Sequence, residues 1–192
     1  REIAPHSKDV TLTLVGDGHE HMNLVSQALA TEYADRIHFS GEVSHNALVD
    51  WYAHADLFVY TSVSETFGNV VNEALWCGVP VVAFDDRMGV AGQVVDRVNG
   101  ALVDPKDPDA EMRFGQTTLA LLRNQSLRQQ LGSEAANLAR RTAHPDVVLG
   151  RFEQIYKDAI RHRKETLPVP LEKRSRLVQL ASFSRHYAAW AW

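Results

Sequence analysis

The chain has little of several features that usually narrow a function. A single cysteine, Cys77, excludes an intrachain disulfide and is compatible with a reducing cytoplasm. The sequence contains no signal peptide, and no apolar run approaches the ~20 residues that a membrane-spanning helix needs. The net charge of −4 gives no overall basic field, so we expect no nucleic-acid partner. These absences predict a cytoplasmic protein.

A metal-binding pattern is also missing from the sequence. Nine histidines are scattered along the chain without a His-Glu-x-x-His motif. Residues 19–21 (HEH) form the only tight cluster, but adjacent residues at a helix start point apart. Residues 107–109 (DPD) resemble the Asp-x-Asp pattern of some metal-dependent enzymes, although Pro108 marks a helix start. We therefore predict neither a metal nor a cofactor.

The most informative stretch lies between residues 56 and 84. Two short apolar segments, DLFVY at 56–60 and VPVVAF at 79–84, have the composition of buried strands. Between them, residues at helical spacing form an apolar side: Phe67, Val70, Val71, Ala74, Leu75 and Gly78. The opposite side carries Asn69, Asn72, Glu73 and Trp76. Gly78 followed by Pro80 predicts the helix end, which makes the segment a strand–loop–helix–strand unit.

A polar loop, SVSETFGN at 62–69, joins the first of these strands to the helix. Ligands of open parallel sheets bind at the carboxyl ends of the strands, where this loop lies. The helix entrance offers unpaired N–H groups and a positive dipole end, which suit a phosphate, and Gly68 lets a ligand approach the backbone. Because Glu65 and Glu73 flank the entrance, the pattern favours a ligand with phosphate and hydroxyls, such as a nucleotide sugar.

The segment 64–84 resembles the donor site of the family 4 glycosyltransferases, which are retaining enzymes with the two-domain GT-B fold. The signature is two glutamates separated by seven residues, here Glu65 and Glu73, followed by the helix exit EALWCGVPVV. The spacing alone would more often mean two solvated carboxylates, but the whole segment in its strand context favours the family. The resemblance implies that Glu65 acts as a catalytic residue on the donor-sugar hydroxyls and that Glu73 binds the ribose. It also implies backbone N–H contacts to the diphosphate at Phe67, Gly68 and Asn69.

A glycine-rich turn follows an earlier predicted strand, VTLTLVGDG at 10–18, and leads to a predicted helix at 22–33. Gly16 and Gly18 end this strand, where they could contact a nucleotide; the alternative is a tight turn without a ligand. A similar turn in the family supports a place near the donor.

The loop after residue 41 is a third candidate. Residues 36–41 alternate as a strand does, and a helix is predicted at 48–54 with Ser44 as its N-cap. In the family this loop lies beside the nucleotide base, so the resemblance makes base-contact candidates of Gly41, Glu42 and Val43.

The segment after residue 84 departs from the family pattern. Gly89 and Gly92 predict a flexible turn, residues 93–98 a short helix, and residues 100–103 a last strand. Many relatives carry Gly-Gly-x-x-Glu here, whereas this chain has GVAGQ at 89–93. Gln93 is a neutral amide where a carboxylate is common, which puts the contact of that carboxylate in doubt.

The rest of the chain is predicted to be helical and then basic. Residues 108–144 have helical composition, with Asp107 as N-cap and Pro108 at the first helical position, and another helix is predicted at 146–162. Basic, proline-containing residues at 161–176 are typical of a linker, and aromatics close the chain in 177–192. Those aromatics predict packing on protein, with peripheral contact at the inner face of a membrane as the alternative. The predicted domains are 1–162 (donor-binding) and 163–192 (linker and aromatic segment).

These patterns predict an α/β fold: a Rossmann-like parallel sheet with helices on both faces and a helical C-terminal extension. By resemblance, the chain is the donor domain of an enzyme that transfers a hexosyl group from a UDP- or GDP-sugar, with retention and without a metal. Its acceptor would be a glycan, a lipid or a small molecule. The alternative is a non-catalytic nucleotide-binding or protein-interaction module that keeps the fold. Because the chain begins at Arg1, we expect a fragment, inactive alone, whose acceptor-binding domain and phosphate-clamping basic residues precede it.

Overall fold

A computed structural model of the protein describes residues 3–166. The chain divides into two compact units, residues 1–143 and 144–192. The second unit is described only through helix α6 (Pro145–Thr166). The predicted aromatic segment at 177–192 lies outside the described residues.

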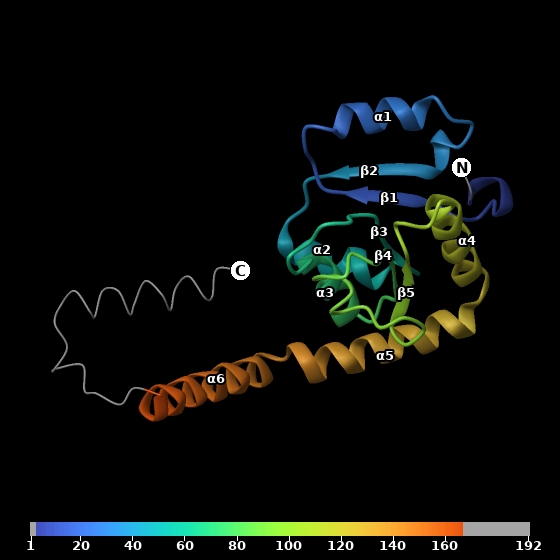
Figure 1. The fold of residues 1–192 in the computed structure, drawn as a ribbon. Helices are drawn as coiled ribbons and strands as arrows, with labels where there is room; N and C mark the ends of the chain where they lie inside the picture. The colour runs from blue at the N-terminus through green and yellow to red at the C-terminus, as the bar shows by residue number, and fades with distance from the viewer. Residues whose placement is uncertain (1–2, 167–192) are drawn as a thin grey trace. The chain divides into compact units, whose positions relative to one another are not determined.

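Parallel strands form the centre of the first unit, as the sequence predicts (Figure 1). Strands β1 (Leu12–Val15) and β2 (Ile37–Gly41) make one sheet. Strands β3 (Phe58–Tyr60), β4 (Val81–Phe84) and β5 (Gly100–Val103) make another, in that order. The expected sheet is therefore present in two parts, and within residues 3–166 both β1 and β3 pair with a strand on one side only.

Helices connect these strands. In chain order they are α1 (His21–Leu29), α2 (His45–Ala53), α3 (Asn69–Trp76), α4 (Ala110–Arg123) and α5 (Gln125–Ala143). Two short 3-10 helices span Ala4–His6 and Ala34–Arg36. Helix α1 ends four residues before the predicted limit at residue 33, whereas the predicted N-cap of α2 is confirmed: the Ser44 hydroxyl accepts a hydrogen bond from the Ala47 N–H at 3.4 Å.

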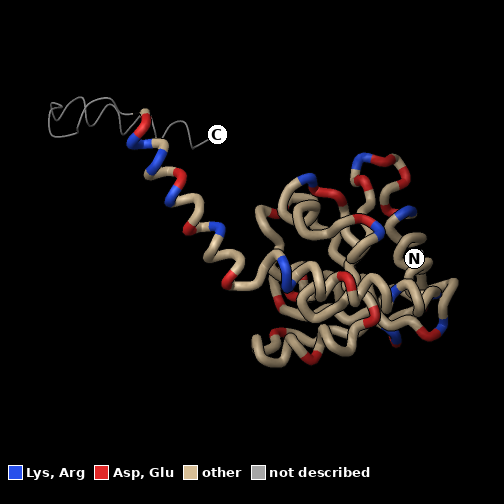
Figure 2. Tube along the Cα trace, turned by 90° about the horizontal axis from the view of Figure 1, so that it is seen from below, with Lys and Arg blue, Asp and Glu red and all other residues tan. Residues whose placement is uncertain are grey.

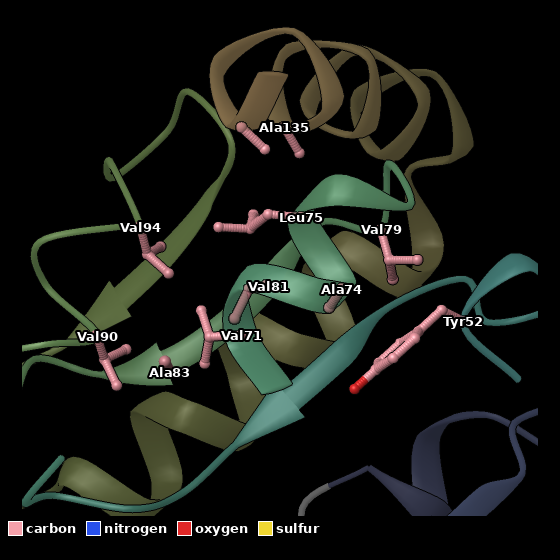
Figure 3. Packing of buried hydrophobic residues seen from close by; sticks show 11 residues of the cluster. Tyr52, Val71, Ala74, Leu75, Val79, Val81, Ala83, Val90, Val94 and Ala135 are labelled. Carbon is pink, nitrogen blue, oxygen red and sulfur yellow. The ribbon is translucent and has the colours of Figure 1, made fainter. Parts of the chain in front are cut away.

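The core surrounds β4, the middle strand of its sheet. Val81, Val82 and Ala83 are 0% exposed. Alternate residues of this strand face opposite sides: Val81 and Ala83 join a cluster with α2, α3 and α5, while Val82 joins another with α4 and α5. Helices thus cover both faces of the sheet. Figure 3 shows the first cluster, with Leu75 of α3 on the side of Ala135 of α5.

Helix α3 ends where the sequence predicts. Gly78 has a φ of +78°, which a left-handed helix cap requires. The Gly78 N–H donates to the Leu75 carbonyl at 3.0 Å, and the Val79 N–H donates to the Ala74 carbonyl at 2.9 Å. This pair of bonds is the Schellman pattern, which satisfies the last helical carbonyls.

The predicted helix at 93–98 is wrong; turns occupy this stretch. The reason is Asn99, whose side chain is almost fully buried. Its Oδ1 accepts from the Val95 N–H at 2.7 Å and its Nδ2 donates to the Gln93 carbonyl at 2.9 Å. These bonds occupy backbone groups that a helix would pair, and Arg97 has a φ of +61°, outside the helical region.

The start of α4 also differs from the prediction. The N-cap is Asp109 and the helix begins at Ala110, not at Pro108. Asp107 instead stabilises the turn before the helix: its Oδ1 accepts from the Asp109 N–H at 2.9 Å, and its Oδ2 pairs with Arg113 Nε at 2.6 Å.

Helix α6 carries a row of exposed apolar side chains together with charges of both signs (Figure 2). Ion pairs along its surface join Lys157 to Glu153 and Arg161 to Asp158. The helix continues to Thr166, so residues 163–166 of the predicted linker are helical. No helix within residues 3–166 is both long and apolar enough to cross a membrane.

Candidate functional site

Two loops meet at the carboxyl edge of the three-stranded sheet: residues 61–68 after β3 and residues 85–93 after β4. The Gly89 N–H donates to the Glu65 carbonyl at 3.1 Å. A Cβ added to Gly89 would lie 2.6 Å from the backbone N and Cα of Phe67. Glycine is therefore required here because the two backbones touch, which makes the loops one structural unit.

Gln93 holds this pair of loops together. Its Nε2 donates to the Phe67 carbonyl, to the Gly89 carbonyl at 3.1 Å and, at 3.5 Å, to the Gly68 carbonyl. Carbonyl oxygens only accept hydrogen bonds, so the side-chain nitrogen must face them and an ionised glutamate could not replace it. The amide that departs from the family pattern thus has a specific structural role.

Asp86 fixes the second loop from within. Its carboxylate accepts hydrogen bonds from the N–H groups of Met88 (2.8 Å), Val90 (3.1 Å) and Ala91 (3.0 Å). Burial by itself favours the neutral acid, but these donors and the Glu65 N–H together outweigh it and lower the pKa of Asp86. The sequence analysis missed this residue, although an aspartate just beyond a strand and before a glycine turn is a common local cap.

The entrance of α3 presents backbone donors. Gly68 has a φ of +78° and occupies the N-cap position without a side-chain cap. Within residues 3–166, no hydrogen bond is formed by the N–H groups of Phe67, Gly68 and Asn69. The structure therefore brings the three predicted phosphate contacts together, at the positive end of the helix dipole.

Two details of this entrance correct the prediction. Phe67 and Val70 were expected on the buried side of the helix but are 50% and 38% exposed, so the buried stripe is limited to Val71, Ala74 and Leu75. Val70 lies in the first turn of α3 and Phe67 just before its N-cap, at the open edge occupied by the loops. A Cβ on Gly68 would meet Val90 and Gln93 side chains at 3.5 and 3.8 Å. These are ordinary contact distances, so glycine is favoured here by its left-handed backbone and not by a lack of space.

A tyrosine hydroxyl contacts each of the two predicted glutamates. Tyr60 Oη donates to Glu65 Oε1 at 2.6 Å, and Tyr52 Oη donates to Glu73 Oε2 at 3.1 Å. Burial raises the pKa of both phenols, and the adjacent carboxylates raise it further. The tyrosines therefore remain protonated donors at neutral pH. Sequence reasoning missed both of them.

The predicted turns of the two-stranded sheet also meet at its carboxyl edge. The Gly16 N–H donates to the Gly41 carbonyl at 2.9 Å, and both glycines have positive φ. This contact places the turn that contains Gly18 beside the loop that leads through Glu42 and Val43 into α2. Within residues 3–166, no group of three or more His, Cys, Asp or Glu side chains could hold a metal ion.

Parallel strands flanked by helices, with loops gathered at their carboxyl edges, define a Rossmann-like domain of the GT-B class. Residues 2–138 match the family model described as Glycosyl transferases group 1. The match covers more than half of the chain, and the protein belongs to the group 1 glycosyltransferases.

Curated relatives agree with this assignment. The D-inositol 3-phosphate glycosyltransferase of Xylanimonas cellulosilytica is 34% identical over 129 residues, which cover 67% of this chain and 30% of that protein. The N-acetyl-alpha-D-glucosaminyl L-malate synthase of Bacillus anthracis is 28% identical over 157 residues, covering 81% and 39%. The chain thus spans only 30% to 39% of these relatives and corresponds to their C-terminal part.

Solved structures show the same fold. HepE of Anabaena, in complex with UDP, is 28% identical with a TM-score of 0.65, covering 81% of this chain and 42% of that one. TarM is 20% identical with a TM-score of 0.69, covering 80% of this chain and 30% of that one, and demonstrates likeness of fold alone.

Proposed function

We propose that this chain is the donor-binding domain of a retaining, metal-independent hexosyltransferase that uses a UDP- or GDP-sugar. The entrance of α3 carries the proposal, because its free N–H groups lie between two glutamates on a family-typical segment. The UDP complex of HepE makes a uridine nucleotide the first ligand to test.

The diphosphate would bind at the N–H groups of Phe67, Gly68 and Asn69. As the bond between the sugar and the nucleoside diphosphate breaks, negative charge develops on the phosphate oxygens of the leaving diphosphate. Donors that are already fixed stabilise that charge without reorganisation, and the loop contacts of Gly89 and Gln93 fix these donors in advance. No metal is needed for that step.

The two glutamates would bind the hydroxyl groups of the ligand. Glu65 would hold the donor sugar as the catalytic residue, and Glu73 would hold the ribose. Within residues 3–166, the structure records no hydrogen bond to Oε2 of Glu65 or to Oε1 of Glu73. Each carboxylate therefore keeps one oxygen for a ligand hydroxyl, and a hydrogen bond to a charged group contributes about 1.5–3 kcal/mol.

The loops of the two-stranded sheet would complete the nucleotide site. Gly16 and Gly18 would approach the nucleotide, and Val43 would contact the base through its backbone. The helix that follows the Val43 loop, α2, contacts α3 through Tyr52 in its last turn, which donates to Glu73.

Within residues 3–166, β1 and β3 each have one edge that pairs with no strand. In a doubly wound sheet of strand order 3-2-1-4-5-6, one parallel strand separates the two halves. Leu12 and Val15 of β1 are 43% and 40% exposed, which an additional strand with its helix would reduce. We therefore place one more strand between β1 and β3, supplied by sequence ahead of residue 1, with the acceptor-binding domain further upstream.

The test is nucleotide binding and turnover by the full-length protein. Calorimetry with UDP and GDP should show binding of one nucleotide, and incubation with a panel of UDP- and GDP-sugars should release it. Glu73→Ala should weaken nucleotide binding by about 1.5–3 kcal/mol. Unchanged affinity in that variant would contradict the ribose role, and no binding of either nucleotide by the natural protein would overturn the proposal.

A further inference from the structure

Three aromatic side chains form a row beneath the two glutamates. Tyr52 of α2 meets Phe58 of β3 edge to face, with ring centroids 5.8 Å apart and an interplanar angle of 71°. Phe58 and Tyr60 stack at 6.0 Å and 21°, since residues two apart on a strand share a face. All three pack in or against the core cluster that contains α3. In Figure 3, the Tyr52 ring lies at one side of this cluster, with its hydroxyl oxygen at the end of the side chain away from its own backbone.

The row carries one hydroxyl at each end, and each hydroxyl reaches a different glutamate. Tyr60 Oη donates to Glu65 at 2.6 Å, and Tyr52 Oη donates to Glu73 at 3.1 Å. A phenol has a single hydrogen to donate. The Tyr60 hydrogen is directed to Glu65, and the Tyr52 hydrogen lies between Glu73, the nearer acceptor at 3.1 Å, and the Val70 carbonyl at 3.4 Å. Each contact restrains the rotation of its carboxylate and leaves the second carboxylate oxygen available.

We propose that Tyr60 and Tyr52 are positioning residues: Tyr60 orients Glu65 toward the donor sugar, and Tyr52 orients Glu73 toward the ribose. This inference rests on the proposed function of the two glutamates. Phe58 sets the spacing of the pair, because it contacts both rings. Packing alone does not require the hydroxyls, since phenylalanine would fill the same ring positions.

Each tyrosine has a distinct expected signature because the two glutamates bind different parts of the ligand. Tyr60→Phe should weaken binding of UDP-glucose by roughly 3- to 30-fold, while UDP, which lacks the sugar, should bind as in the natural protein. Tyr52→Phe should weaken UDP and UDP-glucose by similar factors. A purely structural Tyr60 would change both ligands equally or neither, and a purely structural Tyr52 would weaken UDP as much in a Glu73→Gln background as in the natural protein.

The experiment is calorimetry on the full-length protein with UDP and UDP-glucose. Tyr156→Phe on α6 is the control, because Tyr156 is 65% exposed and lies outside the row. Thermal unfolding of every variant establishes that it is folded. The double variant Tyr60→Phe/Glu65→Gln should lose little more UDP-glucose affinity than Glu65→Gln alone, because the hydroxyl acts through that carboxylate.

Three results would overturn the inference in a protein that binds UDP. These are unchanged UDP-glucose affinity in Tyr60→Phe, an equal loss of both ligands in that variant, or full UDP affinity in Tyr52→Phe. Failure of the natural protein to bind UDP or GDP would instead refute the proposed function itself.

Discussion

Replacing Gln93 by glutamate tests whether the amide, rather than the shape of the side chain, holds the donor-site loops. The two side chains have nearly the same volume, but the carboxylate has no hydrogen to donate at neutral pH. It would face three carbonyl oxygens, those of Phe67, Gly68 and Gly89, that now accept from Nε2. We expect the glutamate to turn into solvent and the loops to separate more easily.

The expected magnitude follows from the contacts. Bonds between neutral groups contribute about 0.5–1.5 kcal/mol each, and the contact to Gly68 at 3.5 Å is at the limit of a hydrogen bond. Losing the other two should therefore destabilise the loops by about 1–3 kcal/mol. A new negative charge near the free N–H groups should oppose a diphosphate by a further ~1 kcal/mol at partly solvated separations.

Two measurements on the full-length protein separate these effects. Gln93→Ala and Gln93→Glu should both lower the unfolding temperature, but Gln93→Glu should lose more UDP affinity, and added salt should reduce that difference. Gln116→Glu on the exposed side of α4 makes the same chemical change away from the site and should leave both quantities unchanged. If Gln93→Glu had the same unfolding temperature and the same UDP affinity as the natural protein, the role of the amide would be refuted.

Three other results are expected. Gly132→Ala should destabilise the domain by about 1–3 kcal/mol in thermal unfolding, because its Cβ would lie 2.4 Å from the Gly78 carbonyl oxygen; Gly150→Ala, with no atom within 4 Å of the new Cβ, should not, and equal effects would contradict the close approach. Asp86→Asn should destabilise the protein at neutral pH. Because the folded-state pKa of Asp86 is lowered, its contribution to the free energy of unfolding is complete above the ordinary carboxyl pKa of about 4. That contribution is lost as the pH falls through the lower folded-state pKa. The stabilities of the natural protein and the variant should therefore converge in acid. Turnover should survive EDTA; activity that is lost and then restored by Mg²⁺ or Mn²⁺ would exclude the proposed phosphate site.

The strand–loop–helix–strand unit could be predicted because its signals are local. The apolar period of α3, the glycine at its end and the short apolar strands all lie within residues 56–84. Glu65, Gly68 and Glu73 could be predicted as site candidates for the same reason, since all three lie in this one continuous segment. Tyr52 had no comparable signal, since it is 21 positions from Glu73 and meets it only because α2 packs near α3. Tyr60 lies in the same segment as Glu65, but an aromatic residue at the end of a strand does not by itself indicate which group its hydroxyl contacts.

Two of the errors have a common physical cause, which is that polar side chains compete with helix formation. Residues 93–98 were predicted to form a short helix, but the side chain of Asn99 binds the backbone at Gln93 and Val95. Asp107 similarly binds the Asp109 N–H and delays the start of α4. The sequence contains both residues, but it does not show whether such a side chain caps a helix or binds backbone groups that the helix would otherwise pair. That outcome depends on burial, as for Asn99.

The loop backbone itself explains why this edge of the sheet suits an anion. Three of its carbonyl oxygens already have protein donors: that of Glu65 accepts from the Gly89 N–H, and those of Phe67 and Gly68 accept from Gln93. Within the described chain, the N–H groups at the entrance of α3 have no acceptor. An anion needs free donors, and the contacts made by Gln93 and Gly89 engage carbonyl oxygens while they leave these N–H groups available. This asymmetry supports a diphosphate bound directly by the backbone, and it gives Gln93 a function that a glutamate at the same position could not perform.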